Sequence, residues 1–249
     1  MLTQPLLDKL TQLRLTAFRA ALEEQRHSAQ YADLAFEDRL GLLVDCECTH
    51  RDHQRLKRRL KAARLPCTAT LEELDLSAAR GLDRRTVLQL AQGEWITQHL
   101  NTIVLGPTGA GKTFCSTVLA HAACQYDFTV RYHRTSRLLL QLTTAHADGS
   151  YAKFLAALAR LQLLVLDDWL RDPLTRAQSQ DLLEILDDRC GRSSTLIVTQ
   201  VPVSDWHLRF PDPTVGEALI DRLVHNAYRL NLKGESRRKT HSPLTMPAT

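Results

Sequence analysis

The sequence lacks the segments that would carry a chain into or across a membrane. No uninterrupted apolar run approaches the roughly 18 to 20 residues that a spanning helix requires. The start, MLTQPLLDKLTQLR, has no basic segment followed by a long apolar one. We therefore expect neither a signal peptide nor a membrane anchor. Cysteine is also sparse, with six in 249 residues, which is too few for a disulfide scaffold and indicates free thiols in a reducing cytoplasm.

Glycine is nearly absent from the first quarter of the chain, where Gly41 stands alone. Leucine and alanine recur there at helical spacing without any alternating strand pattern, which predicts two or three helices. Pro66 ends this region. We interpret residues 1–66 as a small, all-helical N-terminal domain and residues 67–249 as a second domain, which begins with a connector over residues 67–100.

Acidic residues are scarce in one stretch of the helical region. Residues 51–64 hold seven Lys or Arg and the single acid Asp52, although the net charge of the whole chain is only +4. In a helix over residues 36–64, arginines would recur at i, i+4 and i+7 beside an apolar face. Such a basic face suits the phosphates of DNA, and a solvated run of charges is the alternative. The candidate DNA-binding residues of this face are Arg51, Arg55, Arg58 and Arg59.

The second domain alternates short apolar runs with longer helical ones. The expected strands are residues 101–106, 128–133, 161–168, 194–200 and 228–234. Between the first four lie residues 112–125, 136–160 and 175–190, each long enough for helix. This alternation predicts an α/β fold with a parallel sheet that helices cover on both faces.

A phosphate-binding motif follows the first expected strand. The segment GPTGAGKT fits GxxxxGK[ST], in which glycines let backbone N–H groups surround a phosphate chain. Lys112 supplies a charge to the β and γ phosphates, Thr113 offers a hydroxyl to Mg²⁺, and the following helix points its positive end at the same anion. A chance glycine-rich turn is the alternative, which the strand before and the helix after disfavour. The predicted nucleotide-binding residues are Gly106, Pro107, Thr108, Gly109, Ala110, Gly111, Lys112, Thr113 and Phe114.

Two adjacent carboxylates end the strand in LQLLVLDDW. Asp167 fits the Walker B position, where it would hold Mg²⁺ together with Thr113. Asp168 lies one residue further out and could polarise the attacking water. Paired acids that merely end a strand are the alternative, but the phosphate loop favours a catalytic site for nucleotide hydrolysis.

Polar residues elsewhere extend this candidate site. Thr199 and Gln200 end the strand in STLIVTQ, where one of them could sense the γ-phosphate; strand-end solvation is the alternative. Arg222 lies in a helical stretch next to Asp221. It could reach the γ-phosphate of a neighbouring subunit as a trans-acting finger, or form a surface ion pair.

Together these segments resemble the IstB branch of the IstB/DnaC-like AAA+ ATPases. The similar segments are the connector, GPTGAGKT, LLVLDDW, VTQ, DRLVHNAYRLNLKGESRR and the leaders LLDKLTQLRLTAFRAALEEQ and RLKRRLKAARLP. The resemblance covers most of the chain and implies a P-loop AAA+ (ASCE) sheet without an evident C-terminal lid. Arg237 and Arg238 are the candidates for a second sensing arginine.

The resemblance also implies a function. A family member of this kind would be a helper ATPase of an insertion sequence, which uses ATP and Mg²⁺, assembles on double-stranded DNA as a homo-oligomer and cooperates with a cognate transposase. Arg137 and Lys153 match the place where related initiator ATPases present an extra helix to DNA. The sister branch offers an alternative, a DnaC-like helicase loader. A small-molecule P-loop kinase is less favoured, because it would leave the basic helical region unexplained.

Overall fold

In a computed structural model, residues 4–234 are described, and the chain divides into two compact units, residues 1–58 and 59–249. The boundary falls inside helix α3 (Phe36–Ala63) and therefore earlier than Pro66, where the composition changes. The last turn of α3 belongs to the C-terminal unit, in which Ala63 is fully buried.

The N-terminal unit is helical, as predicted. It contains α1 (Gln4–Gln12), α2 (Thr16–His27), the short 3-10 helix η1 (Ala29–Tyr31) and most of α3. One buried carboxylate joins two of these helices: Glu47 on α3 accepts hydrogen bonds from the N–H groups of Ala17 and Phe18, each at 3.0 Å, at the start of α2. Burial acts to raise the pKa of Glu47, but these donors and Arg51 outweigh it, so the pKa lies below its usual value.

A five-stranded sheet forms the centre of the C-terminal unit. Its strands are β1 (Asn101–Leu105), β2 (Val130–Arg134), β3 (Leu163–Asp167), β4 (Ser194–Thr199) and β5 (Ala227–Asn231). The spatial order is β2-β3-β4-β1-β5 and every pairing is parallel. Each strand overlaps a segment where the sequence predicts one, although β2 ends one residue later than expected, at Arg134, and β5 begins one residue earlier, at Ala227.

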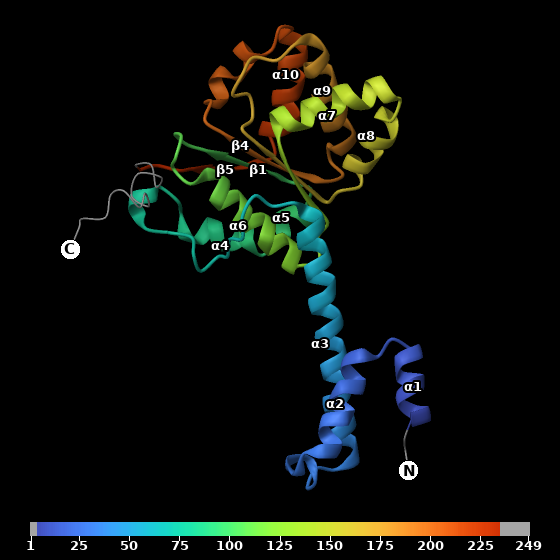
Figure 1. Ribbon diagram of the computed structural model, residues 1–249. Coiled ribbons are helices and arrows are strands. Elements are labelled where there is room, and N and C mark those ends of the chain that lie inside the picture. Colours follow the sequence, from blue (N-terminus) through green and yellow to red (C-terminus); the bar gives the residue numbers. More distant parts are fainter. Residues whose placement is uncertain (1–3, 235–249) are drawn as a thin grey trace, which may run out of the picture. The chain divides into compact units, whose positions relative to one another are not determined.

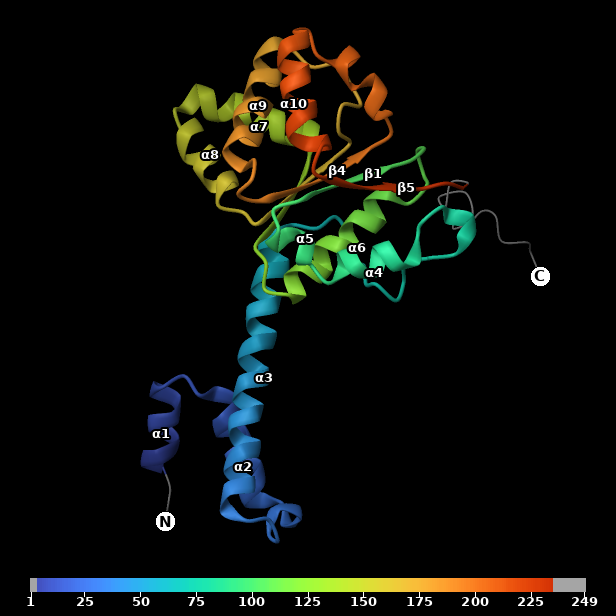
Figure 2. The ribbon, with the colours of Figure 1, turned by 180° about the vertical axis from the view of Figure 1, so that it is seen from behind.

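Helices cover both faces of the sheet, as Figures 1 and 2 show from opposite sides. One face carries α4 (Arg84–Ala91), α5 (Glu94–Thr97) and α6 (Lys112–Gln125). The other carries α7 (Thr135–Asp148), α8 (Tyr151–Ala159), α9 (Arg176–Arg189) and α10 (Pro213–Val224). The expected helical stretch 136–160 is divided at Gly149, whose φ of +74° ends α7 in the left-handed region that glycine adopts without strain.

An apolar core lies between the sheet and helices α7 to α10. Its members include Leu138, Leu142, Leu164, Leu166 and Leu182, all fully buried. Two short 3-10 helices, η2 (Ala78–Arg80) and η3 (Val203–Arg209), complete the regular elements in residues 4–234. Among these described residues, no helix follows β5, and no helix combines the length and apolarity that crossing a bilayer would require.

Candidate nucleotide-binding site

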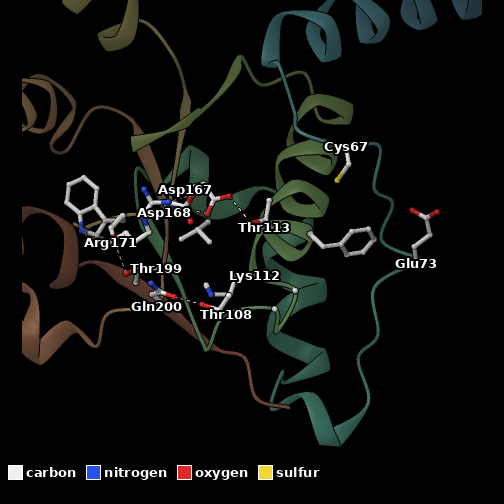
Figure 3. Close-up of a pocket in the computed structure, with 15 residues that line it drawn as sticks. Cys67, Glu73, Thr108, Lys112, Thr113, Asp167, Asp168, Arg171, Thr199 and Gln200 are labelled. Atoms are coloured by element: carbon white, nitrogen blue, oxygen red, sulfur yellow. Dashed lines mark hydrogen bonds and ion pairs between the residues drawn. The ribbon is translucent and has the colours of Figure 1, made fainter. Parts of the chain in front are cut away.

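The carboxyl ends of three neighbouring strands meet at one edge of the sheet. In the parallel register, Leu105 of β1 pairs with Thr199 of β4, and Leu166 of β3 pairs with Ile197 of β4. The residues that follow these strands are therefore brought together, although they are far apart in the sequence. They line a pocket of about 710 Å³, which Figure 3 shows in close-up.

The phosphate loop forms one wall of this pocket. Gly109 and Gly111 have φ values of +84° and +91°, which residues with a side chain rarely adopt. At Gly106, a Cβ atom would lie 2.7 Å from the carbonyl oxygen of Leu232, so only glycine fits beside the chain that follows β5. Helix α6 begins directly after the loop, at Lys112, whose Nζ donates to the Pro107 carbonyl at 2.9 Å. The loop therefore combines backbone freedom with a helix N-terminus, as an anion site requires.

The two predicted magnesium ligands lie next to each other. The Thr113 hydroxyl donates to Asp167 Oδ2 at 2.8 Å, and the backbone N–H of Asp168 donates to Oδ1 at 2.7 Å. Asp167 is almost fully buried at the end of β3. A hydroxyl and a carboxylate are hard oxygen donors of the kind that Mg²⁺ prefers. The two residues therefore fit a magnesium ion.

Asp168 points into the pocket from a turn. Its φ of +55° lies in the left-handed region, so the chain bends sharply as β3 ends. Its side chain is 42% exposed and lies 3.8 Å from the guanidinium of Arg171, which lines the same pocket. Figure 3 shows Asp168 next to Asp167 but directed differently. The two acids are therefore available for different tasks, one at the metal and one toward solvent.

The two sensor candidates differ in their surroundings. Thr199 is buried, and its hydroxyl donates to the Trp169 carbonyl at 2.8 Å while accepting from the Val201 N–H at 3.0 Å. Gln200 is exposed at the pocket, where its Oε1 accepts from the hydroxyl of Thr108 in the phosphate loop. Gln200 is therefore the better placed of the two to contact a phosphate, while Thr199 holds the strand end.

Arg222 lies away from this pocket. The Asn101 side chain, at the start of β1, donates to the Arg222 carbonyl at 3.0 Å, so Arg222 is near the opposite end of a strand about 13 Å long. Its guanidinium forms an ion pair with Asp187 of α9 and donates to the Ala218 carbonyl. Arg222 therefore does not join the nucleotide pocket of its own subunit.

The basic residues of α3 fall into two groups. In the N-terminal unit, Arg51 is bound to the buried Glu47 at 2.8 Å, whereas Arg55 and Arg58 are exposed and contact Asp52 and the Gln54 carbonyl of the same helix. Arg59 belongs to the C-terminal unit and is less exposed than Arg55.

The surroundings of Arg59 explain this difference. Its Nη1 donates to the Cys124 carbonyl at the end of α6 at 2.7 Å, and its guanidinium also pairs with Asp127, so only 19% of the side chain is exposed. We therefore remove Arg59 from the proposed basic face. The other two candidates, Arg137 on α7 and Lys153 on α8, are exposed.

Several site residues were not predicted from the sequence. The hydroxyl of Tyr132, in β2, donates to Asp167 Oδ2 at 2.7 Å. Arg80, in the connector, donates to the Ala110 carbonyl of the phosphate loop at 3.0 Å, and its side chain is only 12% exposed. Cys67 and Glu73, also from the connector, line the pocket beside α6. Strand and connector residues carry no local motif, so only their positions in the fold reveal these contacts. Arg237 and Arg238 lie outside the described residues.

Comparisons with known proteins agree with this geometry. The sequence pattern of the family described as IstB-like ATP binding protein matches residues 8–245. An insertion sequence ATP-binding protein of Sinorhizobium fredii is 43% identical over 96% of this chain and 98% of its own length. The ATP-binding protein of insertion sequence IS1162 from Pseudomonas fluorescens is 45% identical over 82% of this chain and 89% of its own.

Among solved structures, a crystal structure of DnaI is similar in fold. Its TM-score is 0.58 with 16% identity, over 70% of this chain and 93% of that chain. The parallel sheet with helices on both faces and the phosphate loop have the arrangement of an AAA+ fold. The match over nearly the whole sequence then shows that the chain belongs to the family of IstB-like ATP binding proteins.

Proposed function

We propose that this protein is a helper ATPase of transposition, which hydrolyses ATP with Mg²⁺, assembles on double-stranded DNA and cooperates with a transposase. What supports hydrolysis most directly is the 2.8 Å hydrogen bond between Thr113 and Asp167, with Asp168 adjacent. Binding alone would not require a second acid at the pocket. A role in transposition is supported by the relatives, whose printed names are ATP-binding proteins of insertion sequences.

The polar side chains of the predicted motifs have separate tasks in hydrolysis. The loop amides and Lys112 hold the phosphates, and Thr113 and Asp167 hold Mg²⁺, which when bound offsets the charge on the phosphate oxygens. Asp168 orients the attacking water and accepts its proton. Gln200 contacts the γ-phosphate and transmits its presence to Thr108 in the loop. Thr199 supports Gln200 by fixing the backbone at the end of β4.

The second half of the proposal concerns DNA. Arg55 and Arg58 present charge without a buried partner, and this suits phosphate contacts that do not depend on base sequence. Arg51 adds charge to this face although it also contacts Glu47. Arg137 and Lys153 would form a separate contact in the C-terminal unit. Because phosphate contacts release counterions, such binding should weaken steeply with salt.

Assembly would complete the active site. Arg222 is far from the phosphate loop of its own subunit, which is compatible with a finger that acts on the neighbouring subunit's γ-phosphate. The ion pair with Asp187 then represents the state before a neighbour is engaged. A homo-oligomer on DNA would therefore hydrolyse ATP faster than the isolated chain.

The decisive experiment measures ATP hydrolysis by the purified chain alone, with unrelated DNA duplexes, and with duplex plus the cognate transposase. We expect DNA to stimulate hydrolysis and the transposase to change it further. Hydrolysis that ignores DNA but responds to a replicative helicase would instead favour the DnaC-like loader. The likeness to DnaI, at 16% identity, supports a similar fold but does not support a loader function.

A further inference from the structure

The side-chain carboxylate of Asp167 accepts hydrogen bonds from three different donors. Its Oδ2 accepts from the Tyr132 hydroxyl at 2.7 Å and from the Thr113 hydroxyl at 2.8 Å, while Oδ1 accepts from the Asp168 N–H at 2.7 Å. Thr113 and Asp168 belong to the motifs already described. Tyr132 belongs to neither motif, yet it is buried and makes the shortest contact with Oδ2. The two motifs therefore do not explain what the Tyr132 hydroxyl does.

The strand register explains why this tyrosine reaches the carboxylate. β2 is the edge strand beside β3, with Tyr132 paired to Val165 and Arg134 paired to Asp167. Paired residues of parallel strands point to the same face, so Tyr132 and Asp167 share the face that α6 covers. A tyrosine two residues before the end of β2 is long enough to reach the last residue of β3. A phenylalanine would fill the same space without the hydroxyl.

A second contact comes from the same segment of chain. Thr135, the first residue of α7, donates its hydroxyl to the backbone carbonyl of Asp167 at 2.9 Å. Arg134, between the two, is exposed. The junction of β2 and α7 therefore fixes both the side chain and the backbone of Asp167.

We propose that Tyr132 is a positioning residue that orients the Asp167 carboxylate for Mg²⁺, an assignment that rests on the proposed function. If Thr113 and Asp167 held Mg²⁺, the Tyr132 hydroxyl would still be placed to donate to Oδ2. Donors behind a metal ligand fix its orientation, and their loss typically weakens metal binding by about 10- to 100-fold. Tyr132 therefore affects Mg²⁺-dependent ATP binding without touching the nucleotide.

The test replaces Tyr132 by Phe and follows the binding of a fluorescent ATP analogue as Mg²⁺ is added. The Mg²⁺ concentration for half-maximal binding should rise by about 10-fold in Tyr132→Phe, while binding in EDTA should stay unchanged. Tyr151→Phe is the matched control, because Tyr151 also donates to carboxylates, Asp181 at 3.0 Å and Glu184 at 2.8 Å, but does not line the nucleotide pocket. It should leave both titrations unchanged.

A double substitution identifies the partner. In an Asp167→Ala background, Tyr132→Phe should have no further effect on nucleotide binding, since the carboxylate that it orients is gone. Superimposable Mg²⁺ titrations of the parent and Tyr132→Phe would overturn this inference alone. An equal loss of binding in EDTA would also overturn it, because Tyr132 would then support the pocket in general. A parent chain without Mg²⁺-dependent ATP binding would overturn the proposed function as well.

Discussion

The two units of this protein hold their polar side chains in opposite ways. In the C-terminal unit, Asp167 is 3% exposed, and both side-chain oxygens and its carbonyl accept hydrogen bonds. In the N-terminal unit, Arg55 and its partner Asp52 have side chains that are 58% and 71% exposed. An exposed ion pair of this kind contributes roughly 0 to 1 kcal/mol. Under the proposed function, the C-terminal unit would depend on geometry, which one substitution can break, and the N-terminal unit on charge, which accumulates over several residues.

Glu47 and Arg59 refine this comparison, because each differs from its neighbours in sequence in its burial and its interaction partners. Glu47 is a buried carboxylate in the mostly exposed α3, and it accepts hydrogen bonds from the start of α2. Arg59 adjoins the basic face in sequence but is held by Cys124 and Asp127. Charge and position in the sequence therefore do not suffice to assign a role, whereas burial and partners do.

The largest effect is expected from the pocket itself. Asp168→Asn should still bind ATP but hydrolyse it at least about 100-fold more slowly, because it removes the group that accepts the proton of water. Lys112→Ala should instead lose ATP-dependent assembly, since the loop no longer neutralises the phosphates. Nucleotide binding and steady-state hydrolysis, measured separately, distinguish the two. Turnover of Asp168→Asn at the parent rate would show that another group activates the water.

Sharing of the active site between subunits should have the next largest effect. Arg222→Ala and Lys112→Ala should each be nearly inactive alone, but mixtures on DNA should regain hydrolysis, with a maximum at intermediate ratios. In such mixtures an intact loop of one subunit meets an intact arginine of another. The measurement is the hydrolysis rate against mixing ratio, with co-assembly confirmed separately.

A control for this experiment comes from the ion-pair partner of Arg222. Asp187→Ala removes the local ion pair but leaves the arginine available to a neighbour. If Arg222 acts as a finger, Asp187→Ala should remain active. Loss of activity in Asp187→Ala, together with a flat mixing curve, would reduce Arg222 to a local structural residue.

A smaller effect is expected from the connector. Arg80→Ala removes the hydrogen bond to the Ala110 carbonyl and should weaken ATP binding by about 10-fold, the equivalent of a charge-assisted hydrogen bond of about 1.5 kcal/mol. The exposed Arg84, at the start of α4, is a matched control with the same loss of charge. ATP binding is measured by titration for both variants. If Arg80→Ala and Arg84→Ala weaken it equally, the lost charge accounts for the weaker binding, and the contact with the loop does not.

The smallest effect per residue is expected in the N-terminal unit. Replacing Arg55 and Arg58 by Ala should weaken duplex binding equally on unrelated sequences and reduce the slope of log affinity against log salt by about 2, one for each phosphate contact. Arg59→Ala should leave the slope unchanged and lower the melting temperature, because its partners lie within the C-terminal unit. A change of slope in Arg59→Ala, with none in the double variant, would reverse this assignment.

Much of the fold could be predicted because its signals are local. Apolar runs marked all five strands, and the motif GPTGAGKT marked a loop followed directly by helix α6 at Lys112. The division of the stretch 136–160 was not predicted, although Gly149 was visible as a helix breaker. The motif residues Thr113 and Asp167 lie together as expected, because parallel strands present their carboxyl ends at one edge.

The sequence by itself determined where the phosphate loop and the acids at the end of β3 lie, since loop conformation and strand ends depend on residues within a few positions of one another. The tertiary structure alone decided which other residues support them. Tyr132 is 35 positions from Asp167, and Arg80 is 30 positions from Ala110. Strand order and register bring Tyr132 to Asp167. Packing of the connector against the phosphate loop brings Arg80 to the Ala110 carbonyl. Packing likewise separated Arg59 from Arg58, because side chains one position apart on a helix point in different directions and meet different surroundings.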